Sequence, residues 1–485
     1  MRRAPHQDIA LPPPRLGETW QRWLYRELRD RILAGQLPPG SRLPSTRNLA
    51  RQHTIARGTV VAVYEQLALE GYVESKVGSG SVVASALAKP THLQPPRIES
   101  EPSRRALPKT KAQPFPVRPE GHEQRAFRAN QPALDAFPLD QWARLHGRVL
   151  RRLTARDLAG GDARGWEPLR VAVAGYLAQA RGIQASPEQV FITSGTQQAF
   201  DLVARLLAKP GALAVMEEPG YVGATPVLQQ AGWGVQPVPV DGQGLRVDAL
   251  PRAANLCYVT PAHHFPTGAL LGLERRLRLL EWARTTGAWI FEDDYDGEYR
   301  FDGRPVASLQ SLDRDGVLYA FTFTKLLFPA IRLGCMVVPP ALVEPLLQFR
   351  ALVDRFPPVI EQAVLAEFIA QGQFAQHMRR MRELYAGRRA LLAELAQAHW
   401  GERLRLETAH AGLQAAAWLP AGVDDCELVR ALQEVDVEAL PISTAYADPF
   451  QARHGLLLGF AAASEAELRR GAEAVARVLD KSLTK

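Results

Sequence analysis

Three charged side chains near the middle of the chain have the types and spacing needed to hold an aldehyde cofactor. Lys325 ends the segment Phe-Thr-Phe-Thr-Lys, Arg332 follows shortly after it, and Asp293 stands upstream at the end of an apolar run. An amine condenses with an aldehyde, a carboxylate pairs with a protonated ring nitrogen, and a guanidinium binds a phosphate. Pyridoxal 5'-phosphate carries all three of these groups, so the residues predict a site for this cofactor.

Alternating strands and helices are expected to position these residues. From Arg170 onward, apolar runs of strand length alternate with amphipathic segments, which predicts a mainly parallel α/β sheet covered by helices. Each polar motif directly follows an apolar run, at the edge where such sheets bind ligands. We expect the following residues to meet there and bind the cofactor: Gly195, Thr196, Tyr221, Asp293, Tyr295, Thr322, Lys325 and Arg332.

The phosphate end of the predicted site combines a helix start with a counter-charge. Gly195 and Thr196 connect a strand at 190–192 to an amphipathic helix, so free backbone N–H groups can face an anion. Thr322 and Arg332 add a hydroxyl donor and a positive charge. Tyr221 follows another apolar run and can stack on an aromatic ring. Each feature alone also occurs as ordinary packing, and only their combination favours a ligand.

A metal site is the competing hypothesis for two polar clusters. His263 and His264 are adjacent, and carboxylates crowd residues 292–298. Neighbours in sequence seldom bind the same ion, no further ligands accompany the histidines, and one carboxylate suffices for a ring nitrogen. We therefore expect no metal.

Charge is unevenly distributed along the 485 residues. Residues 1–111 hold 18 Lys and Arg against 9 Asp and Glu, whereas the remainder holds 40 against 42. This asymmetry favours a module that binds a polyanion, joined to a nearly neutral one, although a solvated basic face is the alternative. The three cysteines lie far apart, and the sequence has no apolar run of membrane-spanning length. We expect a cytoplasmic protein without a membrane partner.

The N-terminal pattern predicts a winged helix-turn-helix. Helical periodicity covers 20–34, a short helix begins after Ser45, a third helix covers 57–70, and residues 72–83 form a hairpin with a glycine-containing tip. The start of the third helix is the part that enters the DNA major groove in this motif. The residues that we expect to contact DNA are Arg47, Arg57, Thr59, Gly78 and Gly80. Each arginine alone is better explained as a solvated surface charge, and only the whole set in this order of elements favours DNA binding.

Two parts of the chain resemble known families. Residues 37–80 resemble the GntR-type winged helix, on Leu-Pro-Pro-Gly-Ser-Arg-Leu-Pro-Ser-Thr-Arg, Arg-Gly-Thr-Val and Gly-Ser-Gly. Residues 126–485 resemble the fold-type-I aminotransferases, on Gly-Trp-Glu-Pro-Leu-Arg at 165–170 and on the motifs around Lys325. The second resemblance implies that Lys325 is the catalytic residue and forms the Schiff base. It further implies that Asp293 holds the ring nitrogen, Tyr295 donates to the ring hydroxyl, Tyr221 stacks on the ring, and Gly195, Thr196, Thr322 and Arg332 bind the phosphate.

The chain as a whole resembles the MocR-type transcription regulators. The resemblance implies a DNA-binding domain at 18–85, a Pro-rich linker at 86–125, and an aminotransferase-like domain for cofactor binding, effector sensing and dimerisation at 126–485. It also implies binding of a double-stranded DNA operator, a head-to-tail homodimer, and sensing of pyridoxal phosphate, an amino acid or another amine. Net catalysis is not expected beyond a half-reaction of aminotransferase type.

Two positions depart from the aminotransferase pattern. Leu457 stands where these enzymes place the arginine that binds the substrate α-carboxylate. Phe265 replaces an asparagine, which leaves His263 or His264 for any contact from that loop to the ring hydroxyl. Leu457 favours a regulator of the pyridoxine-synthesis (PdxR) kind, which senses the cofactor itself. Two alternatives stay open: an active aminotransferase with an accessory DNA-binding domain, and a DNA-binding protein with an empty, vestigial pocket.

Overall fold

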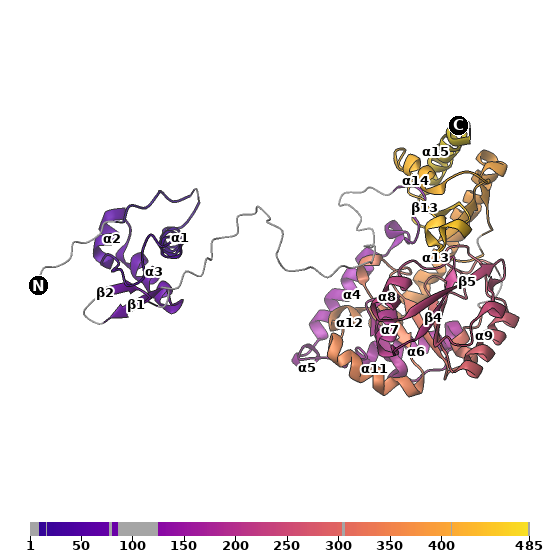
Figure 1. Ribbon diagram of the computed structural model, residues 1–485, viewed down its shortest axis with the longest axis horizontal. Coiled ribbons are helices and arrows are strands. Elements are labelled where there is room, and N and C mark those ends of the chain that lie inside the picture. The colour runs from indigo at the N-terminus through magenta and orange to yellow at the C-terminus, as the bar shows by residue number, and fades with distance from the viewer. Residues whose placement is uncertain are drawn as a thin grey trace, which may run out of the picture. The chain divides into compact units, whose positions relative to one another are not determined.

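The computed structural model divides the chain into two compact units, Met1–Thr110 and Lys111–Lys485. It describes residues 9–15, 17–76, 80–85, 125–302, 306–408 and 410–483. Figure 1 shows a small unit of helices with a hairpin and a large unit in which helices surround a sheet. The predicted linker at 86–125 lies outside the described residues except for Arg125, and so does Gly78.

Three helices and a hairpin form the small unit: α1 (Trp20–Leu33), α2 (Thr46–His53), α3 (Arg57–Leu69), β1 (Val73–Lys76) and β2 (Gly80–Val83). Ser45 caps α2 as predicted, because its side chain accepts a hydrogen bond from Asn48 N. The apolar helix faces meet in one core that includes Trp23, Leu28, Leu49, Val63 and Leu67. The strands pair antiparallel. The predicted winged helix-turn-helix is therefore confirmed.

The large unit is built on an eight-stranded mixed sheet with the order β3-β10-β9-β8-β7-β4-β5-β6. Five adjacent strands run parallel to one another, namely β9, β8, β7, β4 and β5. The strand β10 pairs antiparallel with β3 and β9, and β6 pairs antiparallel with β5. The bounds are β3 (Val190–Thr193), β4 (Leu213–Glu218), β5 (Gly234–Asp241), β6 (Gly244–Leu245), β7 (Leu256–Val259), β8 (Trp289–Asp294), β9 (Val317–Thr322) and β10 (Gly334–Val337).

The reversed direction of β10 is a consequence of its short connection to β9. Only residues 323–333 join these two strands, without a helix long enough to carry the chain back to the opposite edge. A parallel pair needs a crossover of about a dozen residues or more, usually through a helix. The chain therefore turns back, and the turn places Lys325 and Arg332 at the carboxyl edge of the parallel strands.

Alternate residues of the central strands enter two separate cores. Ile192, Phe321 and Cys335 face one buried cluster, whereas Phe191 and Met336 face another. Helices cover both faces, which is the layer arrangement expected for an α/β sheet. The bounds of these helices are α4 (Leu139–Arg152), α5 (Ala155–Leu158), α6 (Glu167–Arg181), α7 (Thr196–Leu206), α8 (Ala224–Gln230), α9 (Leu273–Thr286), α10 (Leu309–Leu312), α11 (Pro340–Val353) and α12 (Val359–Ala370).

The C-terminal part of the large unit forms a smaller antiparallel sheet with three helices. The sheet has the order β11-β12-β14-β13. Its elements are β11 (Arg405–Leu406), β12 (Gln414–Trp418), β13 (Leu440–Pro441), β14 (Gly455–Gly459), α13 (Gln373–His399), α14 (Asp425–Gln433) and α15 (Glu465–Leu483). Within the described residues, every helix is too short or too polar to traverse a lipid bilayer.

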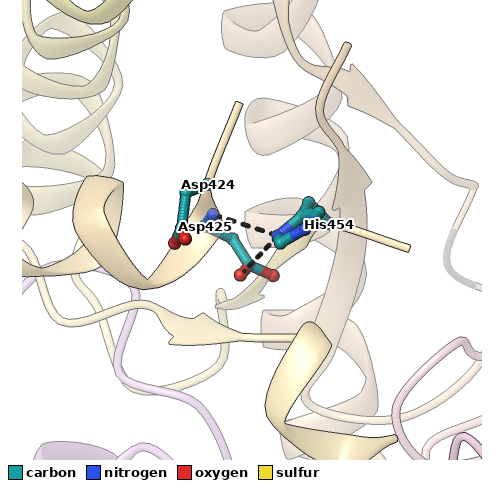
Figure 2. Close-up of side chains that lie close together, drawn as sticks. All are labelled: Asp424, Asp425 and His454. Atoms are coloured by element: carbon teal, nitrogen blue, oxygen red, sulfur yellow. Dashed lines mark hydrogen bonds and ion pairs between the residues drawn. The ribbon is translucent and has the colours of Figure 1, made fainter. Parts of the chain in front are cut away.

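A buried carboxylate fastens the start of α14 to β14. Figure 2 shows Asp424, Asp425 and His454, whose ligand atoms lie within 4.8 Å of one another. Asp425 is fully buried and accepts hydrogen bonds from Ser443 N, Ser443 Oγ and Gly455 N, with His454 Nδ1 at 3.0 Å. Asp424 caps α14 by accepting hydrogen bonds from Cys426 N and Glu427 N. These donors already use the oxygens that a cation would need.

We predict that Asp425→Asn lowers the free energy of unfolding by about 2–3 kcal/mol, because an amide group would face buried backbone donors. Burial raises the pKa of Asp425, but hydrogen bonds from Ser443 and Gly455 outweigh it and hold the pKa below its usual value. A carboxyl group whose pKa is lower in the folded than in the unfolded protein stabilises the fold at pH values above its unfolded pKa. This stabilisation is lost as the pH falls through the pKa of the folded state.

Urea unfolding of the full-length protein, followed by circular dichroism, checks this prediction. Asp424→Asn is the control, since asparagine caps a helix as well as aspartate does. The difference between Asp425→Asn and the wild type should shrink in acid. Equal midpoints for the two variants at neutral pH would contradict the role given to Asp425.

Candidate functional site

All eight residues predicted to bind the cofactor line one cavity of about 1410 Å³ in the large unit. Gly195 and Thr196 follow β3, Asp293 ends β8, Thr322 ends β9, and the β9–β10 turn supplies Lys325 and Arg332. Tyr221 and Tyr295 come from the segments after β4 and β8. The structure therefore brings these residues together at the carboxyl edge of the sheet, as the sequence predicted.

The amine of Lys325 is held by a backbone carbonyl. Its Nζ donates to Asn130 O at 2.7 Å. Asn130 has a left-handed backbone, with φ at 61°, and its own N–H donates to Gln414 Oε1 at 2.8 Å. Asn130 could not be identified from the sequence, because nothing in the pattern around it indicates a carbonyl turned toward a lysine so distant in the chain.

The phosphate end of the cavity combines a helix N-terminus with a guanidinium. Gly195 is the N-cap of α7 with φ at 116°, and no side chain caps the helix. A Cβ added at Gly195 would lie 3.9 Å from Arg332 Nη1 and 4.0 Å from Thr322 Oγ1. Thr324 joins this group, with its Oγ1 at 2.8 Å from that of Thr322. Free N–H groups, hydroxyls and one guanidinium around a small open space suit a phosphate.

Asp293, which lines the cavity, has a buried acceptor without a hydrogen-bond partner in the described part of the chain. Its Oδ2 accepts a hydrogen bond from the Tyr258 hydroxyl at 2.6 Å, whereas its buried Oδ1 has no hydrogen-bond partner among the described residues. Burial, reinforced by the charges of Asp294 and Asp296, raises the pKa of Asp293 to about 7. A protonated ring nitrogen would supply both the missing hydrogen bond and the missing counter-charge. The residues present therefore fit pyridoxal 5'-phosphate at this position.

A second layer of charges holds the end of β8 in place. Arg181 Nε lies 2.8 Å from Asp294 Oδ2, and the Tyr319 hydroxyl donates to the same oxygen at 2.6 Å. Glu298 lies 3.5 Å from Arg181 Nη2. All of these groups are buried. Asp294 is paired with Arg181 and Tyr319, whereas Asp293 lines the cavity.

Aromatic rings form the side of the cavity next to Asp293. Tyr221 stacks on Tyr258 with ring centroids 6.4 Å apart and planes at 19°, and Phe265 meets Tyr221 edge-on. The Tyr221 hydroxyl lies 3.2 Å from Gln197 Oε1. Burial raises the pKa of Tyr221, so its hydroxyl stays protonated at neutral pH. A flat ring above Asp293 would pack against this surface.

The two histidines that the sequence analysis singled out have other partners. His263 Nδ1 lies 2.9 Å from Asp296 Oδ1 and 3.2 Å from the Tyr295 hydroxyl. His264 bonds Thr267 Oγ1 and Pro219 O, and burial lowers its pKa to about 3. His264 is therefore neutral, and His263 orients Tyr295.

A further part of the cavity lining is an apolar wall centred on Leu457. Leu457 is buried in a cluster with Ala129, Ala416, Trp418 and Ile442, and Phe265 and Tyr446 pack against it. Leu457, Ile442, Phe265 and Tyr446 also line the cavity. Arg453, the residue that the sequence offered as a replacement cation, lies over the Trp418 ring at 4.0 Å.

The predicted DNA-contacting residues lie at the starts of α2 and α3. Arg47 and Arg57 are exposed, and Arg57 Nε donates to Thr46 Oγ1 at 3.4 Å, which brings the two helix starts together. Thr59 is half-buried in the first turn of α3, whose N-cap, Ala56, makes no side-chain hydrogen bond. Gly80 begins β2 with φ at 84° and open space where a Cβ would be.

Comparison with known proteins matches both units to families. Residues 127–475 match the family "Aminotransferase class I and II", and residues 21–83 match "Bacterial regulatory proteins, gntR family". The chain is 38% identical to a probable rhizopine catabolism regulatory protein, MocR, of Rhizobium meliloti, over 93% of this chain and 92% of that one. It is 32% identical to the HTH-type transcriptional regulator TauR of Rhodobacter capsulatus, over 98% and 99%. It is 29% identical to the pyridoxine biosynthesis regulator PdxR of Corynebacterium glutamicum, over 96% and 95%.

Solved structures resemble the large unit. The α-aminoadipate aminotransferase LysN of Thermus thermophilus, crystallised with N-(5'-phosphopyridoxyl)-L-leucine, is 27% identical with a TM-score of 0.68 and covers 74% of this chain and 92% of its own. An archaeal alanine:glyoxylate aminotransferase is 25% identical with a TM-score of 0.70, over 74% and 92%. Both confirm the predicted fold-type-I domain. The chain belongs to the MocR-type regulators, in which a GntR-family winged helix is joined to an aminotransferase-like domain that uses pyridoxal 5'-phosphate.

Proposed function

We propose that the chain is a transcription regulator that binds an operator through residues 18–85 and changes its DNA binding when a small molecule enters the cavity of residues 126–485. The observation that carries the proposal is that Asp293, whose buried Oδ1 has no hydrogen-bond partner among the described residues, lines the same cavity as Lys325 and Arg332. The basic N-terminal module supports the DNA half of the proposal, since residues 1–111 hold 18 Lys and Arg against 9 Asp and Glu. The small molecule is pyridoxal phosphate itself, an amino acid or another amine.

Each residue of the cavity has a distinct role in this proposal. When bound, pyridoxal phosphate supplies an aldehyde that condenses with primary amines and a ring that withdraws electrons. Lys325 provides the amine, which Asn130 O orients. Asp293 keeps a proton on the ring nitrogen, and Tyr221 packs on the ring face. Arg332, Thr322 and the start of α7 bind the phosphate.

We further infer that two copies of the chain associate head-to-tail. Several large apolar side chains of the large unit are exposed, among them Leu150 at 44%, Leu158 at 63% and Leu352 at 87%. Leu150 and Leu158 border a groove of about 550 Å³ together with Phe356. Soluble monomers rarely leave such side chains clustered in water, and a second copy would cover them.

Arg57→Ala tests the DNA half of the proposal. We expect operator affinity to fall by roughly 1–3 kcal/mol, because the variant loses a side chain suited to two hydrogen bonds with guanine. The operator is a fragment selected from random DNA by the full-length protein, and binding is measured by fluorescence anisotropy. Arg22→Ala, at an exposed arginine on α1, is the control of equal charge. If Arg57→Ala binds as tightly as Arg22→Ala, α3 is not the recognition helix.

Asp293→Asn tests the cofactor half. Because burial raises the pKa of Asp293 to about 7, the folded apoprotein holds a proton that the unfolded chain releases. The stability of the apoprotein therefore falls as pH rises from the unfolded pKa to about 7. Asparagine cannot ionise, so the variant without cofactor should be more stable than the wild type at pH 8, by on the order of 2 kcal/mol, and bind pyridoxal phosphate more weakly.

Thermal unfolding with and without pyridoxal phosphate measures both effects. Asp315→Asn, at an exposed carboxylate, is the control. A variant that is destabilised at pH 8, or that binds the cofactor as tightly as the wild type, would contradict the assignment of Asp293.

A further inference from the structure

The two ends of the cavity differ in their ability to hold a negative charge. Four cationic residues are among the described residues that line it, namely Arg125, Arg128, Lys325 and Arg332. Arg332 lies beside Gly195 at the phosphate end. Arg125 lies 3.6 Å from Asp436 and also donates to Gln433 O. Arg128 is therefore the cation that could bind a ligand carboxylate near Lys325. It lies two residues before Asn130, whose carbonyl accepts the hydrogen bond from Lys325 Nζ.

Arg128 is already neutralised by a carboxylate. Its Nε and Nη2 lie 2.8 Å and 2.7 Å from Glu438 Oε2, and its side chain is only 9% exposed. A ligand carboxylate would have to compete with Glu438 for this guanidinium. Separating a buried ion pair leaves one charge without a partner, which is strongly unfavourable.

Among the described residues, the wall between Arg128 and Lys325 is formed mainly by apolar side chains. Ala129 packs against Leu457, and the next residue, Asn130, accepts the hydrogen bond from Lys325 Nζ. Leu457 pairs with Ala416 and Leu440 in the sheet and is 2% exposed. Ile442, Phe265 and Tyr446 continue this surface in the cavity. An anion placed against these apolar side chains would lose water that they cannot replace with hydrogen bonds, which is costly.

We propose that the small molecule sensed in this cavity is a primary amine with an uncharged body and no α-carboxylate. The proposal rests on the proposed function, which admits the cofactor, an amino acid or another amine, and it narrows that choice. The cavity of about 1410 Å³ extends beyond the cofactor-binding residues to the apolar wall, so a second ligand has room there. The body of such an amine packs on Leu457 and Tyr446, where a carboxylate would be desolvated.

Titration calorimetry of the cofactor-loaded full-length protein with matched ligand pairs tests this proposal. Phenethylamine and L-phenylalanine differ only in the carboxylate, as do tyramine and L-tyrosine, and 3-methylbutylamine and L-leucine. We expect the amine of at least one pair to bind at least about tenfold tighter than its amino acid. Tenfold corresponds to the lower end of the free energy that one hydrogen bond to a charged group contributes. Amino acids that bind equally or more tightly would overturn the proposal, and so would a loaded protein that binds neither member of any pair.

Two variants test whether Leu457 and Glu438 cause the selectivity. Leu457→Arg should raise the affinity for the amino acid of each pair by at least about tenfold, because it supplies a bidentate partner. Leu457→Met keeps the apolar surface and should leave the preference unchanged. Glu438→Gln frees Arg128 and should also favour the amino acid. An unchanged preference in both Leu457→Arg and Glu438→Gln would show that this wall does not select the ligand.

The absorbance of bound cofactor and the affinity for DNA are recorded on the same protein samples. Loss of either in the wild-type protein contradicts the proposed function. A coloured, DNA-binding protein that prefers amino acids contradicts only the inference about the ligand.

Discussion

The hydrogen-bond register of the central strands is the constraint on which the site depends. Thr193, Gly334 and Thr322 form one row across β3, β10 and β9, and Asp293 pairs with Ala320 of β9. Neighbouring strands lie about 4.8 Å apart, so this register fixes the separation between the phosphate end and the carboxylate. Gly334 is required for it, because a Cβ there would lie 2.9 Å from Gly195 Cα. The site is thus a property of strand pairing rather than of any one loop.

The sequence predicted those parts of the site that follow directly from strand ends. Gly195, Asp293 and Lys325 could be recognised because each polar residue comes after an apolar run, and parallel strands bring their ends together. Asn130 could not be, since its carbonyl reaches Lys325 from 195 positions away and the contact depends on backbone geometry. The partners of His263 were equally hidden, because a sequence does not show which side of a loop faces Asp296. The roles assigned to the cofactor and DNA residues stay predictions.

The two ends of the cavity show how an aminotransferase fold can serve regulation. The phosphate end and Asp293 are arranged to hold a cofactor, and burial of Asp293, whose Oδ1 has no hydrogen-bond partner among the described residues, makes the empty site unfavourable. Ligand binding is therefore coupled to the stability of the sheet edge. The apolar wall presents Leu457 at the position where aminotransferases are expected to place an arginine for the substrate carboxylate.

The central claim is that Lys325 bonds covalently with pyridoxal phosphate. The most direct measurement is borohydride reduction of the loaded full-length protein, followed by mass spectrometry of its peptides. The account predicts one peptide, containing Lys325, with the added mass of the reduced cofactor, and no such peptide from Lys325→Ala. The exposed Lys209 serves as the control, since Lys209→Ala should be labelled like the wild type. An unlabelled protein, or a label on another lysine, would contradict the account.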